Sequence, residues 1–308
     1  MQSTLQIIKT ASAKGFRAAL KTAWWILRVT VVISFGVLLL QYVGAIAKIS
    51  EWLSPLFLHI GLSGEAALVF ISSTLVNPYA AIAVIETVGF DPRSITILAL
   101  MCLCSHNLIL ETTIQKKIGS SAIRMVVIRL SAAFVCAFLL NLILPKTADN
   151  FSAKMFTAQE KIFTEMLSRW AVGTLLLVVK MFTIIVSLTV LQRILADLGA
   201  IRWVSKFFRP LLRIFGLPAK TSFLWIVAQT LGLAYGAAVM MEEKETGKVS
   251  RKELDLLNHH ITVSHSNLED LLLFVAIGAS LFWALFLRFL IAMVVVWERR
   301  IELHLRKS

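Results

Sequence analysis

Two short polar groups interrupt very apolar stretches of this sequence, and their residue types could do chemistry. They are Ser105-His106-Asn107 and Ser264-His265-Ser266-Asn267. Hydroxyl, imidazole and amide groups donate and accept hydrogen bonds, and an imidazole also carries a proton near neutral pH. Such groups are suited to bind a small polar solute. The alternative is that they only satisfy backbone groups at helix ends within a packed bundle.

Ionisable residues follow both polar groups at matching distances. Glu111 and Arg129 follow the first group, and Asp270 and Arg288 follow the second. Charged side chains inside apolar helices are energetically expensive, so they face a partner or a cavity. We expect these acids to pair with the arginines, either as ion pairs that fix the packing or as coupling charges beside a solute. Glu269 lies four residues after the second histidine, so on a helix these two would share a face.

More polar side chains lie in two interrupted apolar segments, residues 65–85 and 220–241. Pro78 removes a backbone donor from the first, and Gly232 and Gly236 weaken helical structure in the second. Interrupted helices at corresponding positions of two halves point to a transport site. The alternative is a kinked helix whose polar side chains are satisfied internally. The candidate binding residues in these segments are Ser73, Thr74, Asn77, Gln229 and Thr230.

The composition is that of a membrane protein. Of 308 residues, 58% are hydrophobic and 16% charged, whereas about a quarter are charged in a typical soluble domain. The apolar residues form blocks of spanning length, such as 122–144 and 170–191. We expect an all-α integral membrane protein of the cell membrane, the inner membrane of a bacterium. The formal charge of +13 comes from Lys and Arg beside these blocks, which predicts membrane lipids as partners and excludes nucleic acid.

The sequence carries no recognisable catalytic or metal-binding motif. It lacks GxSxG, HExxH and a phosphate-binding glycine loop. Cys102, Cys104 and Cys136 all lie in apolar segments, where thiols behave as small hydrophobic groups. The adjacent His259 and His260 are poorly placed to share one metal ion. We therefore expect no enzymatic activity, no metal site and no cofactor.

The two halves of the chain resemble each other. His106 and His265 are 159 positions apart, and at the same offset Ser105, Gly119 and Arg129 recur as Ser264, Gly278 and Arg288. At an offset of 156, Thr74, Tyr79 and Glu86 recur as Thr230, Tyr235 and Glu242. Matches among such varied residue types at near-constant spacing indicate a duplication. We interpret the chain as two tandem repeats, residues 1–150 and 151–308, joined by a polar connector at 146–161.

The charge pattern favours an inverted arrangement of these repeats. Residues 49–64 contain no Lys or Arg, whereas the corresponding stretch 201–216 contains four. Equivalent loops of opposite charge character lie on opposite sides of a membrane. Inversion needs an odd number of crossings per repeat, so we predict that the Ser-His segments, 94–118 and 253–277, are re-entrant hairpins. Both termini are then cytoplasmic, and the connector and the basic stretch 244–252 lie outside.

Two sequence runs resemble a known family. They are 61-GLSGEAALVFISSTLVNPYAAIAVIE-86 and 101-MCLCSHNLILETTIQKKIGSSAIRMVVIRL-130, and they are similar to the nucleoside recognition, or Gate, family of membrane domains. The likeness is strong over 60–130 and weaker over 216–290. Related domains occur in concentrative nucleoside transporters, in the membrane part of ferrous iron transporter B and in spore maturation proteins A and B.

This resemblance implies two Gate-like repeats that form a transporter or gated permeation unit for a small polar solute or ion. The alternative that it allows is a non-transporting scaffold in envelope or spore-type assembly. An enzyme that acts on lipids is a third and weaker interpretation. The resemblance does not identify the solute, and it leaves a homo-oligomer open.

Overall fold

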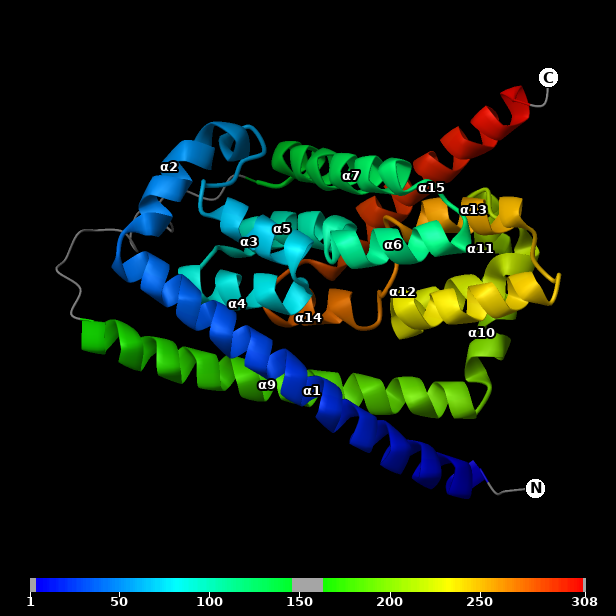
Figure 1. Ribbon diagram of the computed structural model, residues 1–308, viewed down its shortest axis with the longest axis horizontal. Helices are drawn as coiled ribbons and strands as arrows, with labels where there is room; N and C mark the ends of the chain where they lie inside the picture. Colours follow the sequence, from blue (N-terminus) through cyan, green and yellow to red (C-terminus); the bar gives the residue numbers. More distant parts are fainter. Residues whose placement is uncertain (1–3, 146–162, 307–308) are drawn as a thin grey trace.

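A computed structural model describes residues 4–145 and 163–306, and every regular element in these ranges is a helix (Figure 1). The predicted connector, 146–161, lies outside the described residues. The first half contains α1 (Thr4–Tyr42), α2 (Ala45–Leu58), α3 (Ala66–Leu75), α4 (Pro78–Val88), α5 (Pro92–Ser105), α6 (Leu108–Ile118) and α7 (Ala122–Ile143). The second contains α9 (Phe163–Asp197), α10 (Ala200–Phe207), α11 (Arg209–Ile214), a short 3-10 turn (Ala219–Thr221), α12 (Ser222–Glu245), α13 (Arg251–Ile261), α14 (Asp270–Ala276) and α15 (Leu281–Leu305).

The predicted fold class is confirmed. Six described segments are long and apolar enough to cross a bilayer, so the chain is an all-α, multi-pass membrane protein. They are Thr4–Tyr42, Pro92–Ile118, Ala122–Ile143, Phe163–Asp197, Ala219–Glu245 and Leu281–Leu305.

The first interrupted segment is a hairpin. Asn77 has extended backbone angles, and its side chain caps α4 by accepting a hydrogen bond from the Ala80 amide at 2.8 Å. Pro78 occupies the first helical position, where its missing N–H costs nothing. α4 therefore starts in a new direction and packs back along α3, so this segment enters the bundle and returns (Figure 1).

The second interrupted segment also doubles back, although its length and composition suit a crossing. Gly232 inside α12 has φ 79° and ψ 173°, which breaks the helix. A Cβ built on Gly236 would lie 3.3 Å from the Cα of Ala228. Eight residues of straight helix would separate these positions by about 12 Å. The two arms of α12 therefore lie against each other.

The Ser-His segments are not re-entrant, so that prediction was wrong. α5 ends at Ser105, α6 begins at Leu108, and both run toward the same end of the molecule (Figure 1). α13 and α14 likewise continue in one direction, across residues 262–269. Both segments are broken spans. The chain reverses instead at Asn77 and Gly232. The segments predicted to be interrupted crossings are therefore the hairpins, and the segments predicted to be hairpins run through the bundle.

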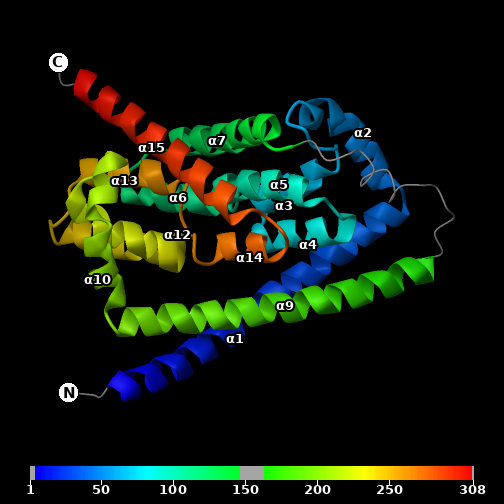
Figure 2. The same ribbon diagram turned by 180° about the vertical axis from the view of Figure 1, so that it is seen from behind.

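Within the described residues, we infer three crossings for each half from the directions of the helices. They are α1, α5–α6 and α7 in the first half, and α9, α13–α14 and α15 in the second. The α3–α4 hairpin opens toward the end where α2 lies, and the α12 hairpin opens toward the end that holds both termini (Figure 2). This arrangement supports inverted repeats, and the division into residues 1–150 and 151–308 remains our proposal.

Equivalent capping residues start equivalent helices in the two halves. Asp91 caps α5 and Ser250 caps α13, while Ser121 caps α7 and Ser280 caps α15. Each pair is separated by 159 positions, the offset of the two histidines. Side-chain caps satisfy amide groups that a helix start leaves without partners. The duplicated sequence thus encodes the same local starting points twice.

The basic loops gather at the end that holds both termini. α10 and α11, the turn between α6 and α7, and the link between α12 and α13 all lie there (Figure 1). The stretch 244–252 therefore shares its end with the termini, and its predicted position on the opposite side was wrong. The error followed from treating residues 220–241 as a crossing.

Candidate functional site

The two histidines meet in the interior of the bundle. His106 Nε2 lies 3.2 Å from His265 Nε2, and both side chains are about 1% exposed. Each histidine occupies the break of a span, one after α5 and one after α13. The two Ser-His breaks, residues 105–107 and 264–267, thus come together as the sequence predicted, although they are not hairpin tips.

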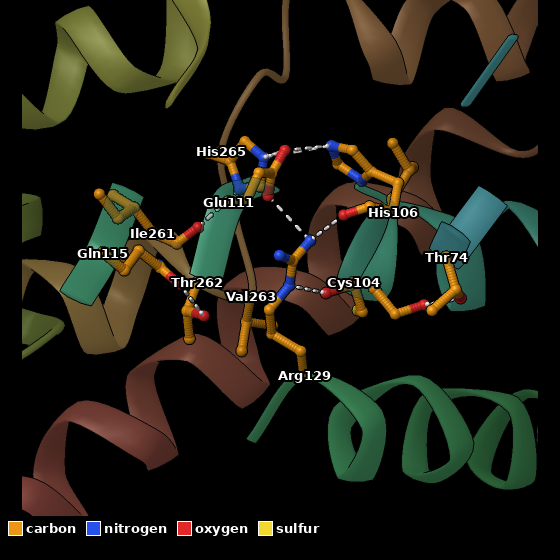
Figure 3. A network of polar contacts seen from close by, with 12 residues as sticks. Thr74, Cys104, His106, Glu111, Gln115, Arg129, Ile261, Thr262, Val263 and His265 are labelled. Atoms are coloured by element: carbon orange, nitrogen blue, oxygen red, sulfur yellow. Dashed lines mark hydrogen bonds and ion pairs between the residues drawn. The ribbon is translucent and has the colours of Figure 1, made fainter. Parts of the chain in front are cut away.

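Two carboxylates complete this contact, which we call the histidine cluster: His106, His265, Glu111 and Asp270. Figure 3 shows His106, His265 and Glu111 of this cluster. Glu111 Oε1 lies 3.1 Å from His106 Nε2 and 3.2 Å from His265 Nε2. Asp270 Oδ2 lies 3.4 Å from His106 Nε2. The first acid of α6 and the first acid of α14 therefore face the same pair of imidazoles.

The two arginines hold the breaks through their main-chain oxygens. Arg129 donates from Nε to the Cys104 carbonyl at 2.9 Å and also binds the His106 carbonyl. Arg288 donates to the Val263 carbonyl at 3.0 Å and to the His265 carbonyl at 2.8 Å. These acceptors are equivalent in the two halves. Guanidinium groups satisfy carbonyls that the broken helices leave free inside the bundle.

The predicted ion pairs formed in one half only. Arg129 Nη2 lies 2.8 Å from Glu111 Oε2. Arg288 instead donates to the Asn267 side-chain oxygen at 2.6 Å, while Asp270 faces His106. The second half therefore replaces a carboxylate partner with an amide.

Glu269 does not pair with the histidine four residues before it. Ser266 has a positive φ of 53°, so residues 265–269 do not form the helical turn that the pairing assumed. Glu269 accepts a hydrogen bond from the Tyr79 hydroxyl at 2.8 Å. This contact joins the α3–α4 hairpin to the second broken span. Tyr79 was not among the predicted site residues, although its recurrence as Tyr235 was a usable signal.

The polar residues of the hairpins contact the breaks. Asn107 N donates to the Ser73 carbonyl at 3.0 Å, and Ser266 N donates to the Ala228 carbonyl, also at 3.0 Å. Thr74 and Ser105 share a hydroxyl hydrogen bond at 3.3 Å (Figure 3). Each hairpin is thus joined to the broken span of its own half.

In the second half, the α12 hairpin reaches the break through an amide side chain. Gln229 donates from Nε2 to the Ser264 carbonyl at 2.6 Å and accepts from Asn267. The Thr230 hydroxyl instead bonds the Ile226 carbonyl within its own helix, and the Thr230 carbonyl accepts from Gln192. Thr230 therefore lies beside the site without joining it.

A second polar network, not predicted from the sequence, links α6 to α13. Thr262 donates to the Gln115 side-chain oxygen at 3.1 Å, and Asn258 donates to Ser120 at 3.0 Å (Figure 3 shows the former). Ser120 in turn binds Asp255, which pairs with Arg299 at 2.7 Å. The network reaches from the histidine cluster toward the end that holds the termini.

The candidate binding residues do not line an open cavity in this conformation. Ser105 and Ser264 are fully buried, and both histidines pack against each other. The groove of about 500 Å³ between α1 and α3 lies on the apolar side of the bundle, lined by residues such as Ile33, Val37 and Leu68. The candidate residues therefore form a closed contact in this conformation.

Comparison with known proteins places this sequence in a family. The family described as "Gate: Nucleoside recognition" matches residues 178–293, from α9 to α15. The match lies in the second half, where the sequence resemblance was expected to be the weaker. The uncharacterized membrane protein YvoD of Bacillus subtilis (strain 168) is 30% identical over 280 residues, which cover 89% of this chain and 88% of that protein. No solved structure matches. The family match and the identity to YvoD show that the chain belongs to the nucleoside recognition (Gate) family of membrane proteins.

Proposed function

We propose that this protein is a transporter, or a gated permeation unit, for a small polar solute that binds at mid-depth between the two repeats. The observation that carries the proposal is the 3.2 Å contact between the histidines of two broken spans from different halves. Transporters with inverted repeats hold their substrates near the midplane, between discontinuous helices. The family association supports transport over catalysis, and we propose no enzymatic activity.

The buried contact corresponds to a state closed to both sides. The main-chain carbonyls of both breaks are satisfied by the arginines within the bundle, so closing is compatible with their burial. Access from one side requires one hairpin to move away from its break. Alternating access of this kind is largely a rigid-body movement of one repeat against the other.

We propose that both termini are cytoplasmic, in the cell membrane of a bacterium. The end that holds the termini carries the basic residues of α10 and α11, of the 244–252 link and of the α15 C-terminus. Excess Lys and Arg mark the cytoplasmic face, where anionic lipid headgroups are expected partners.

The test is solute flux in reconstituted vesicles. A thermal-shift panel of nucleosides, amino acids and other small polar solutes selects the solute, and counterflow of that labelled solute measures transport. We expect the double variant His106→Ala/His265→Ala to lose flux while it remains folded. The matched control, His59→Ala/His304→Ala, removes two histidines outside the cluster and should retain flux.

One observation favours the scaffold alternative: the side chains of the Ser-His breaks are buried in close contact with one another. If the protein is a scaffold, no solute should shift its melting temperature, reconstituted vesicles should show no counterflow, and the protein should form a stable complex with another membrane protein. Flux that is unchanged in the cluster variant would also remove the histidines from the mechanism.

A further inference from the structure

Three metal-ligating side chains converge where the two broken spans meet. The ligand atoms of His106, His265 and Asp270 all lie within 4.8 Å of one another, and all three residues are buried. Glu111 Oε1 also lies within 3.2 Å of both imidazole nitrogens, but it is not part of this mutually close set. The ligands come from both halves of the chain, so neither repeat supplies the set alone.

The main chain fixes which imidazole nitrogen faces the cluster. His106 Nδ1 lies 3.1 Å from the Cys102 carbonyl, and His265 Nδ1 lies 2.7 Å from the Ile261 carbonyl. A carbonyl only accepts hydrogen bonds, so each Nδ1 carries the proton and each Nε2 presents a lone pair. Histidines that bind metals are oriented in this way, with the second ring nitrogen donating to a carbonyl or carboxylate.

Two lone pairs at 3.2 Å repel each other unless a cation lies between or beside them. Two buried carboxylates, Glu111 and Asp270, belong to the cluster, and the buried guanidiniums of Arg129 and Arg288 lie beside it. A proton shared by the imidazoles and a metal ion are the two cations that such a cluster accepts.

The spacing accommodates a metal ion. Metal–nitrogen and metal–oxygen bonds of about 2.0–2.1 Å place neighbouring ligand atoms of a tetrahedral site about 3.3 Å apart. His106 Nε2 lies 3.2 Å from His265 Nε2 and 3.4 Å from Asp270 Oδ2, which is close to this value. Arg129 holds the outer oxygen of Glu111 at 2.8 Å, so the inner oxygen stays directed at the imidazoles.

We infer that the histidine cluster binds one divalent transition-metal ion, with His106 and His265 as nitrogen ligands and Asp270 as an oxygen ligand. Imidazole nitrogen suits zinc, cobalt, iron or nickel, whereas magnesium and calcium prefer oxygen alone. The inference goes beyond the proposed solute transport, because an ion held here would join the two repeats whether or not a solute moves.

The experiment measures metal binding by the full-length protein in lipid nanodiscs. Protein stripped with a chelator is titrated with Zn²⁺ and Co²⁺ by equilibrium dialysis, and the visible absorption of bound Co²⁺ reports tetrahedral nitrogen and oxygen coordination. We expect one ion per chain, and we expect His106→Gln, His265→Gln and Asp270→Asn each to weaken binding at least tenfold. Glutamine keeps hydrogen bonding but replaces the imidazole ligand, and His59→Ala/His304→Ala serves as the control.

Stoichiometric binding by the wild-type protein, lost in the three cluster variants and kept in the control, supports the site. Absence of binding to the wild-type protein at micromolar metal overturns the inference without reference to any variant. Binding that the cluster variants retain also overturns it. Solute counterflow by stripped wild-type protein is a separate readout, so a failed metal site and a failed transport proposal are distinguishable.

Discussion

At the residue scale, Asn107 and Ser266 share an unusual backbone conformation. They have φ values of 47° and 53°, and they are the two non-glycine residues with positive φ in the described ranges. They lie 159 positions apart, each directly after a cluster histidine. Left-handed backbone costs an ordinary residue roughly 1–2 kcal/mol. Both halves thus have the same strained backbone position, and this left-handed residue changes the direction of the chain directly after each histidine.

Substitutions at Asn107 test this conformation. Asn107→Gly should leave the free energy of unfolding unchanged or raise it slightly, because glycine adopts positive φ freely. Asn107→Val should lower it by about 1–2 kcal/mol, because a β-branched side chain is poorly tolerated there. Unfolding of both variants in mild detergent measures the difference. Equal stability of the glycine and valine variants would contradict the left-handed backbone.

The ion pair between Glu111 and Arg129 should dominate local stability. Each single variant, Glu111→Gln or Arg129→Met, leaves a buried charge without its partner and should lower stability by about 3–5 kcal/mol. The double variant should lose less than the sum, by roughly 2 kcal/mol, because neither charge then remains. A double-mutant cycle by reversible unfolding measures this coupling. Strictly additive losses would show that the two side chains do not interact.

At the element scale, the α12 hairpin gives a structural prediction. The double variant Ala228→Cys/Gly236→Cys, made with Cys102, Cys104 and Cys136 replaced by Ala, should form an intramolecular disulfide on mild oxidation. The Cβ position of Gly236 lies 3.3 Å from the Cβ of Ala228, within reach of a bridge. Gel mobility with and without reductant measures the cross-link.

The matched control for this cross-link is Gly173→Cys/Met181→Cys in α9. It has the same spacing of eight residues, but on an uninterrupted helix, where about 12 Å separates the Cα atoms. It should stay reduced. Equal cross-linking of both pairs would indicate non-specific oxidation, and a reduced α12 pair would mean that residues 222–245 form a straight crossing.

The amino-acid sequence identifies the residues of the candidate site better than it predicts which segments cross the membrane and which double back. The offset of 159 positions is enough by itself to identify both histidines, both arginines and both acids of the cluster. It could not decide which segment doubles back, because 65–85 and 94–118 are similarly long and apolar. That choice depends on backbone angles at Asn77 and Gly232, which hydropathy does not report. The pairing of Asp270 with the other half's histidine also needed the three-dimensional arrangement.

At the scale of the whole molecule, the two ends should face opposite sides of the membrane. Trp52 on α2 and Trp203 on α10 are 80% and 74% exposed, and they lie at opposite ends. Single variants Trp52→Cys, Trp203→Cys and Lys248→Cys are treated with an impermeant maleimide in intact cells, again without the native cysteines. We expect labelling of position 52 only, and labelling of 203 and 248 after the membrane is permeabilised.

This experiment also separates the corrected topology from the predicted one. The predicted arrangement placed 244–252 outside, so it expects position 248 to react in intact cells. Labelling of 52 and 203 from the same side would refute inverted repeats altogether. If positions 203 and 248 are both labelled only after permeabilisation, the two basic stretches lie on the cytoplasmic face, as the positive-inside rule requires.

The hydrogen bonds from Asn107 N to Ser73 and from Ser266 N to Ala228 have a mechanical consequence. They connect four parts in series: hairpin, broken span, second broken span and second hairpin, with the imidazole contact as the central link. Movement of either hairpin therefore acts on the contact between His106 and His265 before it acts on the opposite hairpin. Under the proposed transport function, outward movement of one hairpin would therefore strain the imidazole contact on which closure of the other side depends, and the two sides would not open independently.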